Sequence, residues 1–274
     1  MSQPLRWVLS ALVEYARKLY GQRRGSNQPT ILMAAHNLAV GLRAFGHYEL
    51  ARQLDGYTLT RRRRVLGDDH PDTLVSAHNL AADLAIFGDY QRACQLDEDT
   101  LLRRRRVLGD DHPDTLLSAH NLAADLRPLG QHQRARELDE DTLLRRRRVL
   151  GENHPDTLVS ASDLAADLAL LGDYQQACDL GEDTLLRRRR VLGENHPDTL
   201  VTANNVAVGL RALGQYQRAR QLDQETLIRR RRVLGDDHPD TQLSAHNLLA
   251  DLRALGEDEK GRHLNKWIEL RHPS

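Results

Sequence analysis

A stretch of about 42 residues recurs along this chain, and this repetition restricts the possible folds more than any other feature. The tripeptide His-Pro-Asp marks the same point in five copies, beginning at His70, His112, His154, His196 and His238. A glycine marks the middle of every copy, at Gly46, Gly88, Gly130, Gly172, Gly214 and Gly256. A fixed period of this size is typical of solenoids and repeat arrays. We therefore interpret the chain from one repeat.

Each repeat has the pattern of two helices. In residues 72–113, apolar residues recur at the three- and four-residue spacings of an amphipathic helix, at Leu74, Ala77, Leu80, Ala81 and Leu84. This predicts a first helix, helix A, over about 72–87, which Gly88 ends and after which Asp89 is the expected N-cap of helix B. Helix B ends at Gly109, and a turn leads to the next repeat. One helix pair cannot bury both apolar faces, so the repeats must stack.

The strings NLA, GDY and VLGDDHPDT carry a resemblance to a known family. Together with Leu80, Ala81, Leu84, Gly88, Tyr90 and Ala93, they resemble the tetratricopeptide repeat in the 42-residue form of kinesin light chains. Similar arginine-rich arrays occur as sensor regions of bacterial STAND-type regulatory ATPases. The resemblance covers residues 29–274 and implies an all-α fold, a right-handed superhelix (α-solenoid) of about six helix-turn-helix repeats.

The chain divides into two parts on this interpretation. Residues 1–28 are expected to form an N-terminal capping helix and a loop. Residues 29–274 are expected to form the solenoid, with repeats near 29–71, 72–113, 114–155, 156–197, 198–239 and 240–274.

The resemblance also implies a binding site. In tetratricopeptide arrays, part of helix A lines a concave groove, where side-chain amides hold the backbone of an extended peptide. The corresponding residues here are His36, Asn37, His78, Asn79, His120, Asn121, Asp163, Asn204, Asn205, His246 and Asn247. The fourth and fifth repeats carry Ser162-Asp163 and Asn204-Asn205 in place of His-Asn, so the groove is expected to change chemistry along its length. No metal site is expected, because the histidines lack a close ligand cluster.

Five blocks of four arginines are the most conspicuous charged feature, at residues 61–64, 103–106, 145–148, 187–190 and 229–232. Nucleic-acid binding is not favoured, because 39 basic residues are balanced by 39 acidic ones. Four consecutive helical residues also spread over about 300° of the helix. Some arginines must therefore face neighbouring helices. The candidate partners of Arg103 are Asp83, Asp97 and Asp99, and we hypothesise a partly buried Asp/Arg network in which Asp97 contacts Arg103.

Two residues near the end of each helix A vary between repeats. They are Ala85-Ile86, Arg127-Pro128, Ala169-Leu170, Arg211-Ala212 and Arg253-Ala254. Variation confined to positions that packing does not restrict would indicate a tunable binding surface, although drift after duplication would give the same pattern.

The remaining features restrict the functional class. The sequence holds no phosphate-binding or dinucleotide-binding glycine motif, so neither enzyme activity nor a cofactor is expected. It has no apolar run long enough to span a membrane and no signal-peptide pattern. With only two cysteines, which are predicted to be too far apart to pair, a cytoplasmic protein is expected.

The sequence therefore predicts a protein-interaction module that binds a peptide or protein segment in the groove. Its expected role is the sensor or scaffold part of a bacterial regulatory system, with a signalling ATPase domain in the same or another chain as a further partner. Two alternatives stay open: a structural array that self-associates, and nucleic-acid binding through the arginines.

Overall fold

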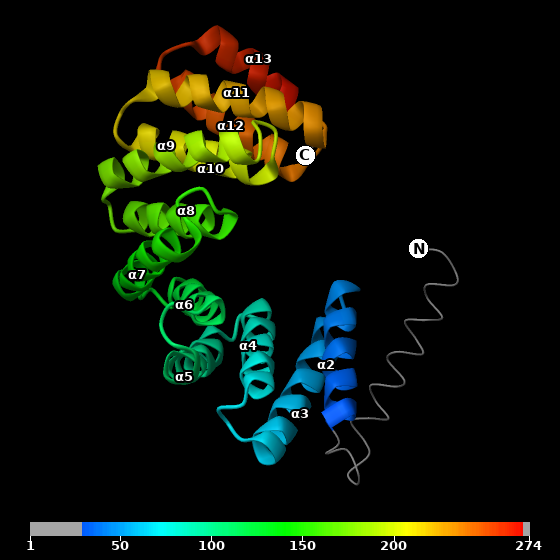
Figure 1. Ribbon diagram of the computed structural model, residues 1–274. Helices are drawn as coiled ribbons and strands as arrows, with labels where there is room; N and C mark the ends of the chain where they lie inside the picture. Colours follow the sequence, from blue (N-terminus) through cyan, green and yellow to red (C-terminus); the bar gives the residue numbers. More distant parts are fainter. Residues whose placement is uncertain (1–28, 271–274) are drawn as a thin grey trace. The chain divides into compact units, whose positions relative to one another are not determined.

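The computed structural model describes residues 29–270, which form twelve α-helices and no strand (Figure 1). The first helices of the repeats, called the A helices, are α2 (Pro29–Ala44), α4 (Pro71–Ile86), α6 (Pro113–Leu126), α8 (Pro155–Leu170), α10 (Pro197–Ala212) and α12 (Pro239–Ala254). The B helices are α3 (Tyr48–Leu66), α5 (Tyr90–Leu108), α7 (His132–Leu150), α9 (Tyr174–Val191), α11 (Tyr216–Leu234) and α13 (Asp258–Glu269). The predicted all-α repeat array is confirmed. The predicted capping helix lies outside the described residues.

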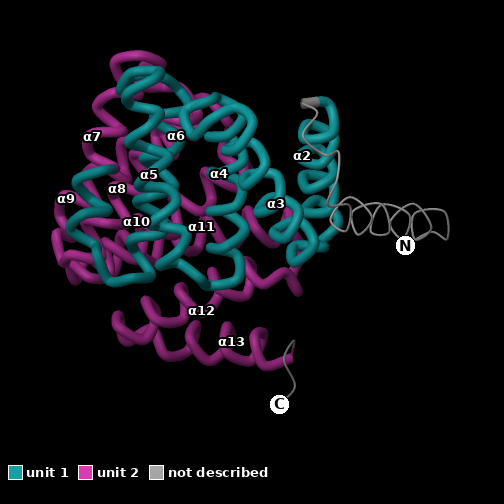
Figure 2. The backbone as a smooth tube through the Cα atoms, turned by 90° about the horizontal axis from the view of Figure 1, so that it is seen from below, with its two compact units in different colours: residues 1–138 teal, residues 139–274 magenta. Residues whose placement is uncertain are grey.

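The chain divides into two compact units, residues 1–138 and 139–274, which Figure 2 colours separately. Helices that follow each other in sequence pack together within each unit, and A helices of successive repeats also touch, as α4 touches α6 and α8 touches α10. Across residues 29–270, no helix combines the length and the apolar character needed to cross a membrane.

The His-Pro-Asp turn starts each A helix from α4 onward. His112 is the N-cap of α6, and its Nδ1 accepts a hydrogen bond of 3.2 Å from the backbone N–H of Asp114. Pro113 occupies the first turn, where its missing N–H costs nothing. His70, His154, His196 and His238 make the same bond. These histidines are therefore turn and cap residues.

The connection between the helices of one repeat depends on a glycine. Gly88 has a φ of +76°, in the left-handed region where a Cβ is disfavoured, and it lies between α4 and α5. Asp89 stands at the N-cap of α5, as predicted, but its side chain makes no capping bond. Its carboxylate instead pairs with Arg92, at 3.1 Å.

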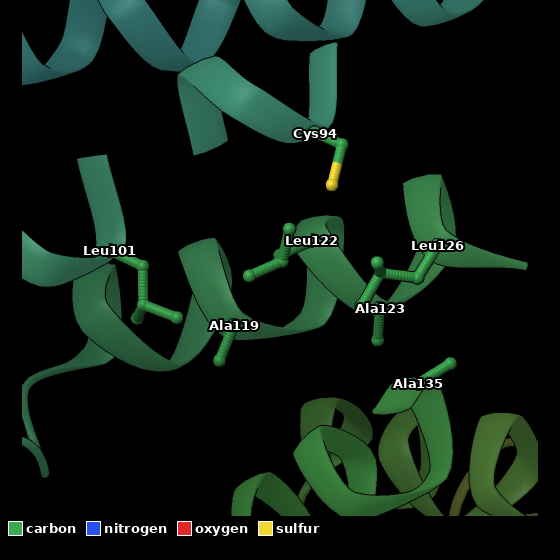
Figure 3. Packing of buried hydrophobic residues seen from close by; sticks show 7 residues of the cluster. All are labelled: Cys94, Leu101, Ala119, Leu122, Ala123, Leu126 and Ala135. Carbon is green, nitrogen blue, oxygen red and sulfur yellow. The ribbon is translucent and has the colours of Figure 1, made fainter. Parts of the chain in front are cut away.

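Small and aliphatic side chains form the core. Ala81 of α4 and Ala93 of α5 are completely buried, so the two helices pack closely. One cluster joins Cys94 and Leu101 of α5 to four residues of α6 and to Ala135 of α7 (Figure 3). Burial of one such aliphatic side chain stabilises the fold by about 1.5–3 kcal/mol.

The second arginine of each tetrad is buried and links a B helix to the next A helix. Arg104 is 2% exposed, and its Nη1 donates to the carbonyl of Asp114 at 2.9 Å and to Ser118 Oγ at 2.8 Å. Because those acceptors lie on α6, the arginine holds α5 and α6 together. The same pair of bonds is made by Arg62, Arg146, Arg188 and Arg230.

The first arginine of the tetrad has a different environment. Arg103 donates to Asp99 and to Asp69, both at 2.9 Å, and stays partly exposed. The predicted pair of Arg103 with Asp99 is confirmed, but the contact of Arg103 with Asp97 in the hypothesised network is wrong. Asp97 lies instead near the charges of Arg104 and Asp125.

Candidate functional site: the helix A face and its pocket

The predicted groove residues form hydrogen bonds between successive A helices. Asn79 Nδ2 lies 3.3 Å from His36 Nδ1, and Asn121 Nδ2 lies 3.1 Å from His78 Nδ1. At the other end of the chain, Asn247 donates to Asn204 Oδ1 at 2.8 Å. Six of the eleven residues are thus brought together in pairs, and each pair links two repeats.

The histidines in these pairs are acceptors. Burial lowers the pKa of His78 to about 4, and the charge of Arg104 contributes to this shift. Burial likewise lowers the pKa of His36, with Arg62 and Arg43 adding to the effect. Both rings are therefore neutral at pH 7, and a neutral ring nitrogen can accept the amide N–H of asparagine.

Of the other five predicted residues, His120 lies close enough to His78 to contribute to its lowered pKa. Asn37, Asn205 and His246 are exposed, and the His246 ring contacts the carbonyl of Gln242 at 2.8 Å on its own helix. His120 and Asp163 are half-buried.

A pocket of about 440 Å³ opens between α8, α9 and α10, beside two of the predicted positions. It is lined by Ser162, Ala165, Ala166, Ala169, Leu170, Tyr174, Ala177, Cys178, Gly181, Thr202, Asn205, Val206, Val208 and Gly209. None of these lining residues is charged. A few polar groups, including the amide of Asn205, stand among mostly apolar walls, which is the usual composition of a ligand site.

Three small residues line the pocket, and two of them are glycines that neighbouring side chains approach closely. A Cβ added to Gly181 would lie 2.8 Å from Val206 Cγ2, and one added to Gly209 would lie 2.7 Å from Cys178 Sγ. Ala169 is the third residue. The corresponding sequence positions in four other repeats hold Arg43, Asp55 and Asp83; Ala85, Asp97 and Asp125; Arg127, Asp139 and Asp167; and Arg211, Asp223 and Asp251. The pocket exists where a charged cluster has been replaced by two glycines and an alanine.

The structure corrects the interpretation of the variable residues at the ends of the A helices. Arg211 Nε donates to Asp251 at 2.5 Å and its Nη2 to Asp223 at 2.6 Å, and both carboxylates are fully buried. Packing therefore restricts the residue at position 211, because its arginine neutralises a buried pair of acids. The pocket residues Gly181 and Gly209 were missed by the sequence analysis. The sequence feature that could have identified them is the absence of both acids and the arginine from the corresponding positions of one repeat.

A succession of helix pairs, one pair to each repeat, defines the class of helical-repeat proteins. A family model described as tetratricopeptide repeat matches residues 30–93, 76–143 and 117–185, and a second model of the same description matches 199–240. The chain belongs to the tetratricopeptide repeat family. Such repeats are in general non-catalytic protein-interaction modules.

Solved structures with the same fold include a putative kinesin light chain of Podosopora anserina with nearly identical TPR-like repeats. It is 29% identical, with 75% of this chain and 97% of that chain covered and a TM-score of 0.66. BtubC (BKLC) from P. vanneervenii is 20% identical over 87% of this chain and 95% of that chain, with a TM-score of 0.68.

A third similar structure is a STAND signal-transduction ATPase with a tetratricopeptide repeat sensor, from Pyrococcus horikoshii. It is 13% identical over 99% of this chain and 40% of that chain, with a TM-score of 0.70. None of the curated proteins compared with the chain matches it.

Proposed function

We propose that this protein binds a peptide or protein segment on its A helices, with the pocket between α8, α9 and α10 as the anchor for an apolar side chain. The observation that carries the proposal is the pocket itself, because its uncharged walls and its volume of about 440 Å³ suit a side chain the size of leucine or larger. Burying such a side chain contributes about 1.5–3 kcal/mol.

Asn205 is proposed as the polar contact of the anchor. It lines the pocket and is exposed, whereas Asn79 and Asn121 are engaged with histidines of the preceding repeat. An asparagine amide can both donate to and accept from a peptide backbone. The predicted groove residues that form pairs would then act mainly by holding successive A helices in register.

The proposed role is that of a sensor or scaffold in a regulatory system. An array that binds a segment has no catalytic group of its own to report the event, so a separate signalling domain would have to respond. The similar STAND protein carries its repeats as a sensor, and this supports the proposal by likeness of fold.

The test is a selection of peptides from a randomised library against the full chain, followed by affinity measurements on variants. Ala169→Arg places a long charged side chain into the pocket. We expect it to weaken the selected peptides roughly ten- to hundredfold, since 1.4 kcal/mol corresponds to about tenfold. Asn205→Ala is expected to weaken them less.

The matched control is Ala212→Arg, the same exchange at an exposed position of α10 outside the pocket. It should leave the affinities unchanged. Equal binding by Ala169→Arg and the parent chain would contradict the proposed anchor. Assembly into larger species, with no peptide selected, would favour the self-associating alternative.

A further inference from the structure

The same cluster of one arginine and two buried aspartates is built twice in the structure with all its members in contact. Arg43 of α2 donates through Nε to Asp83 of α4 at 2.7 Å and also pairs with Asp55 of α3. Arg211 of α10 binds Asp223 of α11 and Asp251 of α12 in the same way. All four carboxylates are 0% exposed, while each arginine side chain stays 21% exposed. The guanidinium therefore covers the acid pair from the solvent side.

Between α4, α5 and α6 the acids are present but the arginine is missing. Asp97 of α5 and Asp125 of α6 keep their positions, and Ala85 of α4 stands where the arginine would be. Asp97 Oδ1 and Asp125 Oδ2 are buried without a hydrogen-bond partner. Asp55 and Asp223 also leave one oxygen unpaired, but the other oxygen of each binds a guanidinium.

Two observations distinguish this pair from the others. Asp125 is 5% exposed and Asp97 is 1% exposed, whereas the acids of both arginine-bearing pairs are 0% exposed, so Asp125 keeps a small exposed edge where the arginine is lost. In the fourth repeat, by contrast, the arginine and both acids have disappeared together, leaving Ala169, Gly181 and Gly209. Compared with the clusters of Arg43 and Arg211, this pair keeps its acids without the arginine.

We propose that Asp97 and Asp125 form a receptor site for the guanidinium group of an arginine side chain from a bound peptide or protein. The external guanidinium would take the place that Arg43 and Arg211 occupy in their own repeats. Arginine is favoured over lysine because its planar fork can donate to two carboxylates at once. The site rests on the proposed function, because its ligand is a segment of the same kind, but it lies in a different compact unit from the apolar pocket.

The surroundings strengthen such a contact. Cys94, Leu122 and Leu126 belong to the apolar cluster of this region, and charges interact more strongly where water is excluded (Figure 3). Two cations are nearby, but both have other partners: Arg104 binds the carbonyl of Asp114 and Ser118, and Arg134 binds Glu98.

The acids of this pair hold protons more tightly than ordinary carboxyl groups, as do Asp55 and Asp223 in the arginine-bearing clusters, where burial raises the pKa to about 7 and about 8. Burial raises the pKa of Asp97 to about 8, with Asp125 adding to the rise and Arg104 opposing it. Burial raises the pKa of Asp125 to about 6. Binding of a cation favours the charged carboxylates, so it should release protons at pH 7 and become tighter as the pH rises from 6 to 8. The thiol of Cys94 lies near both carboxylates, and burial keeps it protonated with a pKa of about 11.

The experiment uses the full chain and three capped tripeptides that differ only in a central arginine, citrulline or lysine. Nuclear magnetic resonance of labelled aspartate carboxyl groups at pH 8 follows the binding. We expect the arginine peptide to shift the signals of Asp97 and Asp125 and to bind at least about tenfold more tightly than the uncharged citrulline peptide. Equal affinity for arginine and citrulline, or for arginine and lysine, would overturn the assignment.

Two variants test where the arginine peptide binds. Ala85→Arg supplies the missing guanidinium from the chain itself and should abolish binding of the arginine peptide. Ala212→Arg, the same exchange at an exposed position of α10 outside both sites, should leave it unchanged. Undiminished binding to Ala85→Arg, or an equal loss of binding in Ala212→Arg, would refute the site. If Ala85→Arg does not fold, the nearly isosteric double variant Asp97→Asn with Asp125→Asn takes its place.

These outcomes are independent of the apolar pocket. The library peptides test the proposed function through their loss of affinity for Ala169→Arg. The tripeptides test the arginine site alone, because they carry no large apolar side chain to fill the apolar pocket. Failure of one site therefore leaves the result for the other intact.

Discussion

Asp97 is a residue at which stability should depend on pH. Its folded pKa of about 8 lies above the ordinary 3.8, so the folded chain keeps a proton that the unfolded chain releases. The free energy of unfolding therefore falls as the pH rises from about 4 to about 8. Each pKa unit corresponds to about 1.4 kcal/mol.

Asparagine has no charge to bury, so Asp97→Asn is expected to exceed the parent chain in stability by a few kcal/mol at pH 8 and by much less at pH 4. Urea unfolding followed by circular dichroism at both pH values measures the difference. A difference of the same size at both values would contradict the raised pKa.

Arg104 is expected to matter far more than its neighbour in the same tetrad. Replacing it by methionine keeps the aliphatic stem but leaves the Asp114 carbonyl and Ser118 without their donor and Asp97 without a nearby cation. We expect Arg104→Met to cost about 3 kcal/mol. The control is Arg105→Met, whose side chain is 40% exposed and should cost less than about 1 kcal/mol. Thermal unfolding of both variants measures the two losses of stability. Similar losses would contradict the different contributions of Arg104 and Arg105.

Helix periodicity could have identified the buried arginine before the structure. Residues 97 and 104 are seven apart, close to two full turns at about 3.6 residues per turn, so they share a face. Arg103 is one position short and lies on another face, which explains why the hypothesised Asp97–Arg103 pair was wrong. The contacts of Arg103 with Asp69, by contrast, depend on how two repeats stack, and local periodicity contains no information about this.

At the scale of the helix, the start of α6 depends on the cap formed by His112. Loss of the Nδ1 acceptor in His112→Ala should destabilise the chain by about 1 kcal/mol. His112→Asn restores a side-chain acceptor at the same place and should recover most of this loss. Chemical denaturation of the two variants checks the prediction. If His112→Asn lowers stability as much as His112→Ala, then His112 acts through packing of its ring and not through capping.

Helix ends were predictable because local chemistry sets them. The glycine between the helices of each repeat adopts a positive φ, as Gly88 does, and proline begins each A helix. Pro128 explains the shorter α6, which has 14 residues where α4 has 16. The pocket between α8, α9 and α10 was not predictable from one repeat, since it arises from glycines on two different helices. It required a comparison of equivalent positions across repeats.

At the scale of the whole molecule, each copy of the repeat adds basic residues together with acidic residues that pair with them. Every tetrad brings arginines into the chain, and the same repeat brings the acids that bind them, as with Arg103 and Asp99 or Arg187 and Asp183. The total is 39 basic and 39 acidic residues, with no net charge. A conspicuous arginine block in the sequence is thus a poor guide to the charge of the surface.

This balance leads to a prediction about nucleic acid. Binding to a phosphate backbone depends on cations that can release counterions, and arginines already paired with carboxylates such as Asp69 and Asp99 would first have to give up those partners. We therefore expect no measurable affinity for duplex DNA at physiological salt, as followed by fluorescence anisotropy of a labelled duplex. Micromolar binding with a steep salt dependence would contradict it. Because replacing Asp69 and Asp99 by asparagine would release Arg103, that double variant should bind more tightly than the parent chain at low salt.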